Sequence, residues 1–255
     1  MRDRRGFVLI FVLLTVVSLA GLVAILRLRA LEEGRLARLP RLQQELRLSL
    51  PALARWCWEQ ALNSTSQQAP VLESENQTLS LDCSVEGFEV QATFSREETR
   101  LNLNQAREEE LLRLFEQEGI APERARVMAA SLLDWIDPDP EHRVSGAEAS
   151  FYEPLGYEPR NAALTRLDEV VFVRGFDPYL FWLDPGLYQV VTIYTRQGRP
   201  EEGPEGPWRL DQPGIYREEL EIKHQGRHWR YLEILESPGP GRPPRVLFRR
   251  LLPIR

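Results

Sequence analysis

Four acidic side chains fall in one short stretch at a spacing that suits a hard cation. They are Asp137, Asp139, Glu141 and Glu148. Counted from the first, they occupy positions one, three, five and twelve, the oxygen spacing of an EF-hand calcium loop. Position six is His142 instead of glycine, so we assign no EF-hand, but a divalent cation such as Ca²⁺ would relieve the repulsion between these carboxylates. The alternative is an Asp-Pro turn that ends a helix, with solvated acids.

The chain has two cysteines, Cys57 and Cys83, and they form no CxxC motif. A metal site built on thiolates is therefore not expected. If the domain lies outside the cytoplasm, a disulfide between them is one possible state. The other is a pair of unbonded, buried thiols.

No arrangement typical of an enzyme is present. The three histidines, His142, His224 and His228, form no HExxH motif. GxSxG, a phosphate-cradling glycine loop and a Cys/His nucleophile signature are also missing. We therefore expect no catalytic residues and no enzymatic activity.

The net charge of the chain is −6, and the first six residues contribute +2, which leaves −8 for the rest. A body that acidic disfavours nucleic acid as a partner. The segment 101–136 has the order of a helix-hairpin-helix module, but its hairpin carries Glu118 and Glu123, which would repel phosphate.

The N-terminal segment predicts a membrane anchor. Residues 7–26 contain no charged side chain, and a helix of that length spans roughly 30 Å, the thickness of a bilayer core. Residues 1–6 form a short leader with three arginines, which favours an amino end that stays inside the cell. We expect a single span with the remainder translocated.

Hydrophobic periodicity divides the remainder into three parts. Residues 27–103 predict an amphipathic helix and the first strands of a sheet, 104–186 an inserted helical subdomain, and 187–255 the remaining strands. Strands are predicted at 78–85, 87–94, 188–195, 216–223, 229–235 and 245–248. Helices are predicted at 105–118, 122–136 and 164–173. The expected class is α+β, with a long N-terminal helix packed on an antiparallel sheet.

The junction at Gly6 and Phe7, which follows two arginines, resembles the prepilin peptidase site of type IV pilins and type II secretion pseudopilins. The resemblance implies cleavage after Gly6 and N-methylation of Phe7. Most pilins carry glutamate at the fifth mature position, but here that position is Phe11. The missing glutamate is a feature of the minor pseudopilin K.

Further motifs resemble the minor pseudopilin K of type II secretion. They are LNLNQA at 101–106, LLDWIDPD at 132–139, GAE at 146–148 and LDEV at 167–170. This resemblance implies a pilin-like fold in the bacterial inner membrane, with a periplasmic domain that caps the pseudopilus tip and promotes its assembly. It also implies calcium in the helical domain, and partnership with other minor pseudopilins and the prepilin peptidase.

Two other functions remain open at this point. One is a minor pilin of a type IV pilus or DNA-uptake system, which would use the same anchor. The other is a signal-anchored extracytoplasmic enzyme. Gene neighbours distinguish the first from a pseudopilin, and an activity that survives in the domain would identify the second.

Overall fold

The computed structural model describes residues 49–64, 78–85, 87–183, 185–195, 209–224 and 226–252. Residues 54–255 form one compact unit, and residues 49–53 belong to another. The predicted leader and membrane segment, 1–6 and 7–26, lie outside these ranges. Within the ranges, no helix is long and apolar enough to cross a membrane.

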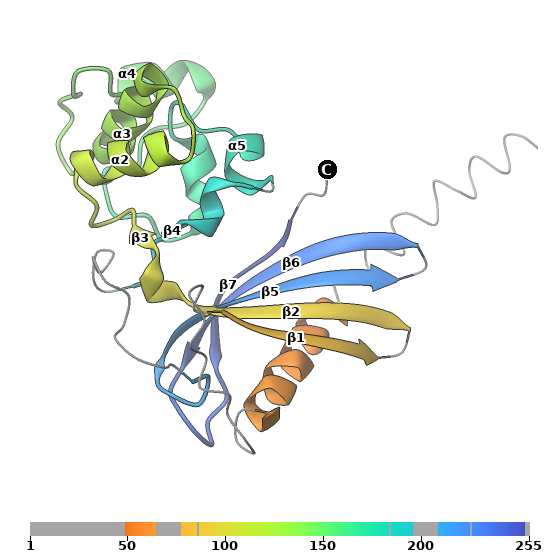
Figure 1. Cartoon of the computed structure of the whole chain (residues 1–255). Helices are drawn as coiled ribbons and strands as arrows, with labels where there is room; N and C mark the ends of the chain where they lie inside the picture. The colour runs from red at the N-terminus through yellow and green to blue at the C-terminus, as the bar shows by residue number, and fades with distance from the viewer. Residues whose placement is uncertain are drawn as a thin grey trace, which may run out of the picture. The chain divides into compact units, whose positions relative to one another are not determined.

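A five-stranded antiparallel sheet has the order β1-β2-β5-β6-β7 (Figure 1). Its strands are β1 Thr78–Val85, β2 Phe88–Arg96, β5 Gly214–His224, β6 Arg227–Ser237 and β7 Arg245–Leu252. The hairpin turn between β1 and β2 contains Gly87, whose φ of 81° suits a residue without a Cβ. The strand order places β2 beside β5, although more than a hundred residues separate them along the chain.

The elements between β2 and β5 are mainly helical. They are η1 Glu97–Thr99, β3 Leu101–Asn102, α2 Glu108–Gln117, α3 Pro122–Ile136, α4 Ala149–Tyr152, η2 Glu153–Leu155, η3 Leu167–Phe172, α5 Pro178–Trp182, η4 Leu187–Gln189 and β4 Val191–Thr192. Local signals explain their ends: Gly119 follows α2 with a φ of 77°, and Pro122 opens α3 where no amide donor is needed. Asp177 caps α5 by accepting hydrogen bonds from the amides of Tyr179 and Leu180, both at 2.9 Å.

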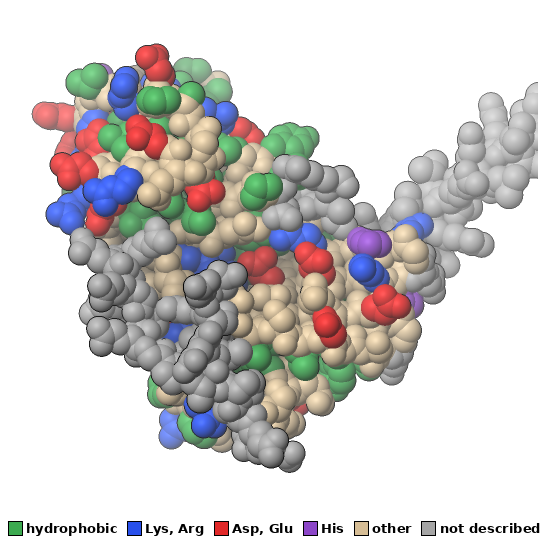
Figure 2. Space-filling view, viewed as in Figure 1, with side chains coloured by type: hydrophobic (Ala, Val, Ile, Leu, Met, Phe, Trp, Pro, Cys, Tyr) green, Lys and Arg blue, Asp and Glu red, His purple; other side chains and the backbone are tan. Residues whose placement is uncertain are grey.

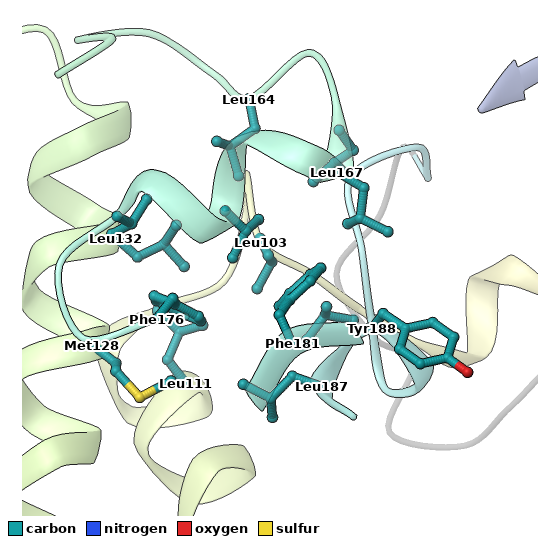
Figure 3. Packing of buried hydrophobic residues seen from close by; sticks show 14 of the residues in the cluster. Leu103, Leu111, Met128, Leu132, Leu164, Leu167, Phe176, Phe181, Leu187 and Tyr188 are labelled. Carbon is teal, nitrogen blue, oxygen red and sulfur yellow. The ribbon is translucent and has the colours of Figure 1, made fainter. Parts of the chain in front are cut away.

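Apolar side chains from these elements pack into one core. Figure 3 shows members that come from α2, α3 and the segments that follow them, including Leu111, Met128, Phe176 and Phe181. Ile234 and Phe248, from β6 and β7, belong to the same cluster. The helical elements and one end of the sheet therefore share a single hydrophobic core.

A second packing layer lies between helical residues 54–64 and the sheet. Trp58 is 1% exposed and makes edge-on contacts with Phe94 of β2 and Tyr216 of β5, with ring centroids 5.9 and 5.5 Å apart. The alternate residues of the same strands form the opposite face, where Gln91 is paired in register with Glu221 and Glu89 with Lys223. Figure 2 shows charged side chains over this polar face.

The predicted α+β class with an antiparallel sheet is confirmed. The strands at 78–85, 216–223 and 229–235 and the helix at 122–136 are also confirmed. The strand predicted at 188–195 was wrong, because the segment forms η4 and the two-residue β4. The helix predicted at 164–173 is a short 3₁₀ helix. In both places packing around the core overrides the local periodicity.

Candidate functional site

The loop that follows α3 is held by Asp134, which is fully buried at the end of that helix. The backbone amide of Arg143 donates to both Asp134 carboxylate oxygens, at 3.2 and 3.1 Å. The Arg143 guanidinium donates to Asp134 Oδ1 at 2.8 Å and also to Asp137. One cation therefore bridges two carboxylates that lie one turn apart.

Glu148 closes the same loop and is 5% exposed. Burial raises its pKa, and the negative charges of three neighbours raise it further. The neighbours are Asp134, Asp137 and Asp139. Glu148 Oε1 and Asp137 Oδ1 are buried and accept no hydrogen bond from the described residues. The loop thus gathers more negative charge than Arg143 alone neutralises.

Gly146 permits this close packing because it has no side chain. A Cβ at this position would lie 1.9 Å from Asp134 Oδ2, which is an impossible contact. The Gly146 carbonyl accepts a hydrogen bond from Arg174 Nη1 at 2.9 Å. The GAE and LLDW motifs therefore meet at Asp134.

The structure draws together only part of the predicted cation set. Asp137 and Glu148 lie in the carboxylate cluster, whereas Asp139 and Glu141 are exposed, with the Glu141 amide donating to Asp139 Oδ1 at 3.0 Å. Among the residues that the structure describes, no three acidic, histidine or cysteine side chains are close enough together to hold a metal ion. The set stays a prediction. Sequence reasoning missed Asp134, although its spacing of three from Asp137 places both on one helix face.

The two cysteines lie side by side. Cys57 Sγ and Cys83 Sγ are 3.7 Å apart and unbonded, with Cys57 buried on the helix and Cys83 on β1. Burial raises the pKa of both thiols. A modest approach of the two sulfur atoms would reach the bonding distance of about 2.05 Å. The other two predicted residues, Gly6 and Phe7, lie outside the described residues.

A buried ion pair joins the sheet to the helical elements. The Arg217 guanidinium on β5 donates to both carboxylate oxygens of Glu97 on η1, at 2.9 and 2.7 Å, and both side chains are fully buried. It also donates to the carbonyls of Tyr188 and Val191. Burial alone would raise the pKa of Glu97, but the charges of Arg217 and Arg100 outweigh it and lower that pKa. Arg217 therefore fixes three segments at once.

The LNLN motif has a structural role. Leu101 and Leu103 are core residues, while the Asn102 side chain donates to the Thr195 carbonyl at 2.5 Å. The Asn104 amide group donates to the carbonyl of Leu164 at 3.0 Å and accepts from its backbone N–H at 2.7 Å. The motif thereby connects segments that lie far apart in the sequence.

The helix-facing side of the sheet contains a carboxylate pair. Glu218 on β5 lies opposite Glu233 on β6, and the two are 0% and 4% exposed. Glu233 accepts a hydrogen bond from the Tyr231 hydroxyl at 2.7 Å, but neither Glu218 oxygen has a hydrogen-bond partner in the described ranges. Burial, and then the charge of Glu233, raises the pKa of Glu218 well above its ordinary value.

The comparison with protein families decides the assignment of these motifs. Residues 88–183, which include the buried ion-pair acid, the LNLN motif and the Asp134 loop, match the family model described as "Type II secretion system (T2SS), protein K". Over this segment the chain is similar to the type II secretion protein K family. The resemblance that the motifs predicted is therefore confirmed. Protein K is a structural pseudopilin of the secretion system, and its family is not an enzyme family.

The fold agrees with a solved structure from the same system. A chain of the crystal structure of the GspK–GspI–GspJ complex from enterotoxigenic Escherichia coli matches with a TM-score of 0.56 at 18% identity. The match covers 83% of this chain and 98% of that one. No curated protein matches the sequence. At this identity the solved structure establishes a shared fold.

Proposed function

We propose that the chain is a minor pseudopilin that caps the tip of a type II secretion pseudopilus and promotes its assembly. The observation that carries this proposal is the protein K match over residues 88–183, at the elements that build the Asp134 loop. The fold shared with a chain of the GspK–GspI–GspJ complex supports it. The function is assembly with other minor pseudopilins and not catalysis.

The membrane segment supplies the assembly handle in this proposal. Residues 7–26 anchor the precursor in the inner membrane, and the domain lies in the periplasm. Helical residues 54–64 pack on the sheet, as the helix of a pilin-like fold with an inserted helical subdomain does. Because the fifth mature residue is Phe11 and not glutamate, no buried carboxylate pairs with the amino terminus of a preceding subunit. That suits a subunit with none ahead of it.

Processing by the prepilin peptidase tests the proposal. The mature protein from its native cell is expected to begin at Phe7, with a methylated amino terminus, by intact mass. A Gly6→Ala chain is expected to retain the leader and to lose co-purification with the other minor pseudopilins, because cleavage frees the helix for extraction. A Ser18→Ala chain, changed within the apolar segment, serves as the control and should be processed normally. Normal cleavage of Gly6→Ala, or an unprocessed wild-type chain, contradicts the proposal.

We also propose that the loop after α3 binds a divalent cation, with Ca²⁺ as the best candidate. The predicted donors Asp137 and Glu148 each carry a buried oxygen that no described group bonds, and Asp134 adds a further carboxylate. Hard divalent cations prefer such oxygen ligands. Asp139 and Glu141, the other two residues of the predicted set, are exposed. Arg143 contributes the positive charge in the present arrangement.

The thiol pair gives a separate prediction. In the periplasm we expect Cys57 and Cys83 to form a disulfide, each thiol losing one hydrogen as an external oxidised disulfide is reduced. Closing a loop of 26 residues stabilises the folded state by roughly 3.5 kcal/mol in the chain-entropy model. Mass spectrometry of alkylated protein, purified without reductant, should find no modified cysteine. A Cys57→Ser chain should carry one alkylated thiol, and two alkylated thiols in wild-type protein would contradict the prediction.

A further inference from the structure

The helical elements expose a group of large apolar side chains. Phe151 on α4, Leu155 on η2 and Phe172 on η3 are 38%, 57% and 52% exposed. Tyr157, two residues after η2, is half-buried beside them. We refer to these four residues as the apolar patch. Folded proteins mostly expose large apolar side chains singly, so a contiguous group of them indicates a surface that contacts a partner.

Two chain segments come together to form the apolar patch. The Tyr157 and Phe172 ring centroids are 5.8 Å apart, and the Tyr157 hydroxyl donates to the Phe172 carbonyl at 3.0 Å. The fully buried Tyr152 connects the other members, because its ring centroid lies 5.1 Å from that of Phe151 and 5.5 Å from that of Tyr157. Leu155 lies in the short turn between the two tyrosines. The patch is therefore one continuous surface.

Further contacts fix the conformation of the apolar patch. The backbone amide of Arg174 donates to the Tyr152 hydroxyl at 3.2 Å, and the Arg174 guanidinium lies 4.8 Å from the centroid of the Phe151 ring. Gly156 turns the chain with a φ of 87°, and apart from its chain neighbours a Cβ there would meet no described atom within 4 Å. Aromatic side chains that are already fixed lose little conformational entropy when a partner binds. The patch is thus both rigid and open.

The surroundings of the apolar patch are acidic. Residues 134–160 contain seven acidic residues and two arginines, a net charge of −5 with histidine taken as neutral. Glu153 and Glu158 belong to the same turn as the patch, and both are exposed. Arg160 already pairs with Glu169 at 3.2 Å, so its charge is partnered within the chain. A segment that combines apolar side chains with positive charge would complement both properties of this surface.

We propose that the apolar patch binds a segment of a partner protein that carries apolar and positively charged side chains together. The apolar side chains of that segment cover Leu155 and Phe172, and its lysine or arginine side chains pair with Glu153 and Glu158. An anionic lipid surface is disfavoured, because its head groups would meet these two carboxylates. A second copy of the chain carries a net charge of −6 and would be repelled. The inference goes beyond the proposed function, because it adds a contact surface on the helical elements.

Site-specific photo-cross-linking of the full-length chain in its native cell tests this contact. The photoreactive residue p-benzoylphenylalanine replaces Leu155 or, as a second position on the patch, Phe172. The control position is Glu116, an exposed residue of α2. After irradiation, mass spectrometry identifies the cross-linked protein and the segment attached to the probe. Both patch positions are expected to capture the same protein through a segment with apolar residues and a net positive charge, and the control position should not capture it.

Charge reversal beside the patch tests the electrostatic part of the proposal. Glu153→Lys with Glu158→Lys, in the chain that carries the probe at 155, is expected to lower the cross-linking yield at least about fivefold, because attraction becomes like-charge repulsion. Glu116→Lys with Glu118→Lys reverses two exposed acids on α2 and should leave the yield unchanged. All four side chains are exposed, so the Tm of each variant should stay that of the parent chain.

Several outcomes would contradict the proposal. They are an equal yield at the patch and control positions, attachment through an acidic segment, and a yield that does not depend on Glu153 and Glu158. Cross-linking only to lipid, only to a second copy of this chain, or to nothing at all would also overturn it.

Discussion

Replacing Arg217 by methionine is expected to lower the free energy of unfolding by about 3–5 kcal/mol, because it leaves the buried Glu97 carboxylate without its partner. The change also removes hydrogen bonds to the carbonyls of Tyr188 and Val191. For a chain of this size the loss corresponds to a fall in Tm of roughly 10 °C. Thermal and urea unfolding of the purified chain would measure it.

Two further variants separate the effect of the unpaired buried charge from the effect of losing an arginine side chain. Arg245→Ala removes an arginine that also pairs with a glutamate, Glu236 at 2.6 Å, but is 73% exposed. It should cost less than about 1 kcal/mol. The double variant Arg217→Met with Glu97→Gln should recover part of the loss, because no unpaired buried charge remains. A cost for Arg217→Met as small as that of Arg245→Ala would contradict the role of this ion pair.

The folded chain is expected to lose stability as pH rises above about 5, because Glu218 is buried without a hydrogen-bond partner among the described groups. A raised folded pKa means that the folded state binds more protons than the unfolded state. Its stability contribution is therefore complete below the ordinary value of 4.5 and is lost as pH rises through the folded pKa. The slope is at most about 1.4 kcal/mol per pH unit for each such group. Urea midpoints between pH 5 and 8 would measure it.

Substitution identifies the group responsible for the slope. Glu218→Gln removes the charge and should flatten the slope, while raising stability at pH 7.5 by more than about 1 kcal/mol. Glu233 and Glu148 also have raised pKa values and would leave a smaller residual slope. Glu97, whose pKa is lowered, changes stability only below its ordinary value of 4.5, outside this window. Glu221→Gln, on the same strand but 57% exposed, should leave the slope unchanged. An unchanged slope in Glu218→Gln would contradict the assignment of the pH dependence to Glu218.

Local patterns predicted much of the fold. Alternation along Thr78–Val85 predicted β1 with the bounds that the structure shows. The start signal at Pro122 likewise predicted α3 with the observed bounds, Pro122–Ile136. These signals succeed because the hydrogen bonds and side-chain periodicity of one element depend on neighbouring residues. They failed at residues 188–195, where the buried Tyr188 and Val191 pack in the shared core. The segment forms a short 3₁₀ helix and a strand of only two residues instead of one long strand.

In the loop after α3, too, the sequence predicted one part of the arrangement and tertiary packing decided the rest. The sequence shows that four acidic residues lie close together, and that they form no enzyme motif. They are Asp137, Asp139, Glu141 and Glu148. Asp134 lies near Asp137 and Glu148, whereas Asp139 and Glu141 are exposed. This arrangement depends on how the loop turns back onto α3, which requires Gly146 to pass close to Asp134.

The sequence alone determined the class of fold and the K-type motifs, because each depends on residues that lie close together along the chain, and for the same reason it predicts the membrane anchor. Only the tertiary structure decided which charges are partnered. Glu97 and Arg217 are 120 residues apart in the sequence, and Glu218 faces Glu233 through the register of β5 and β6. A sequence carries no direct record of such distances, because they follow from the strand order and from the core that fixes it.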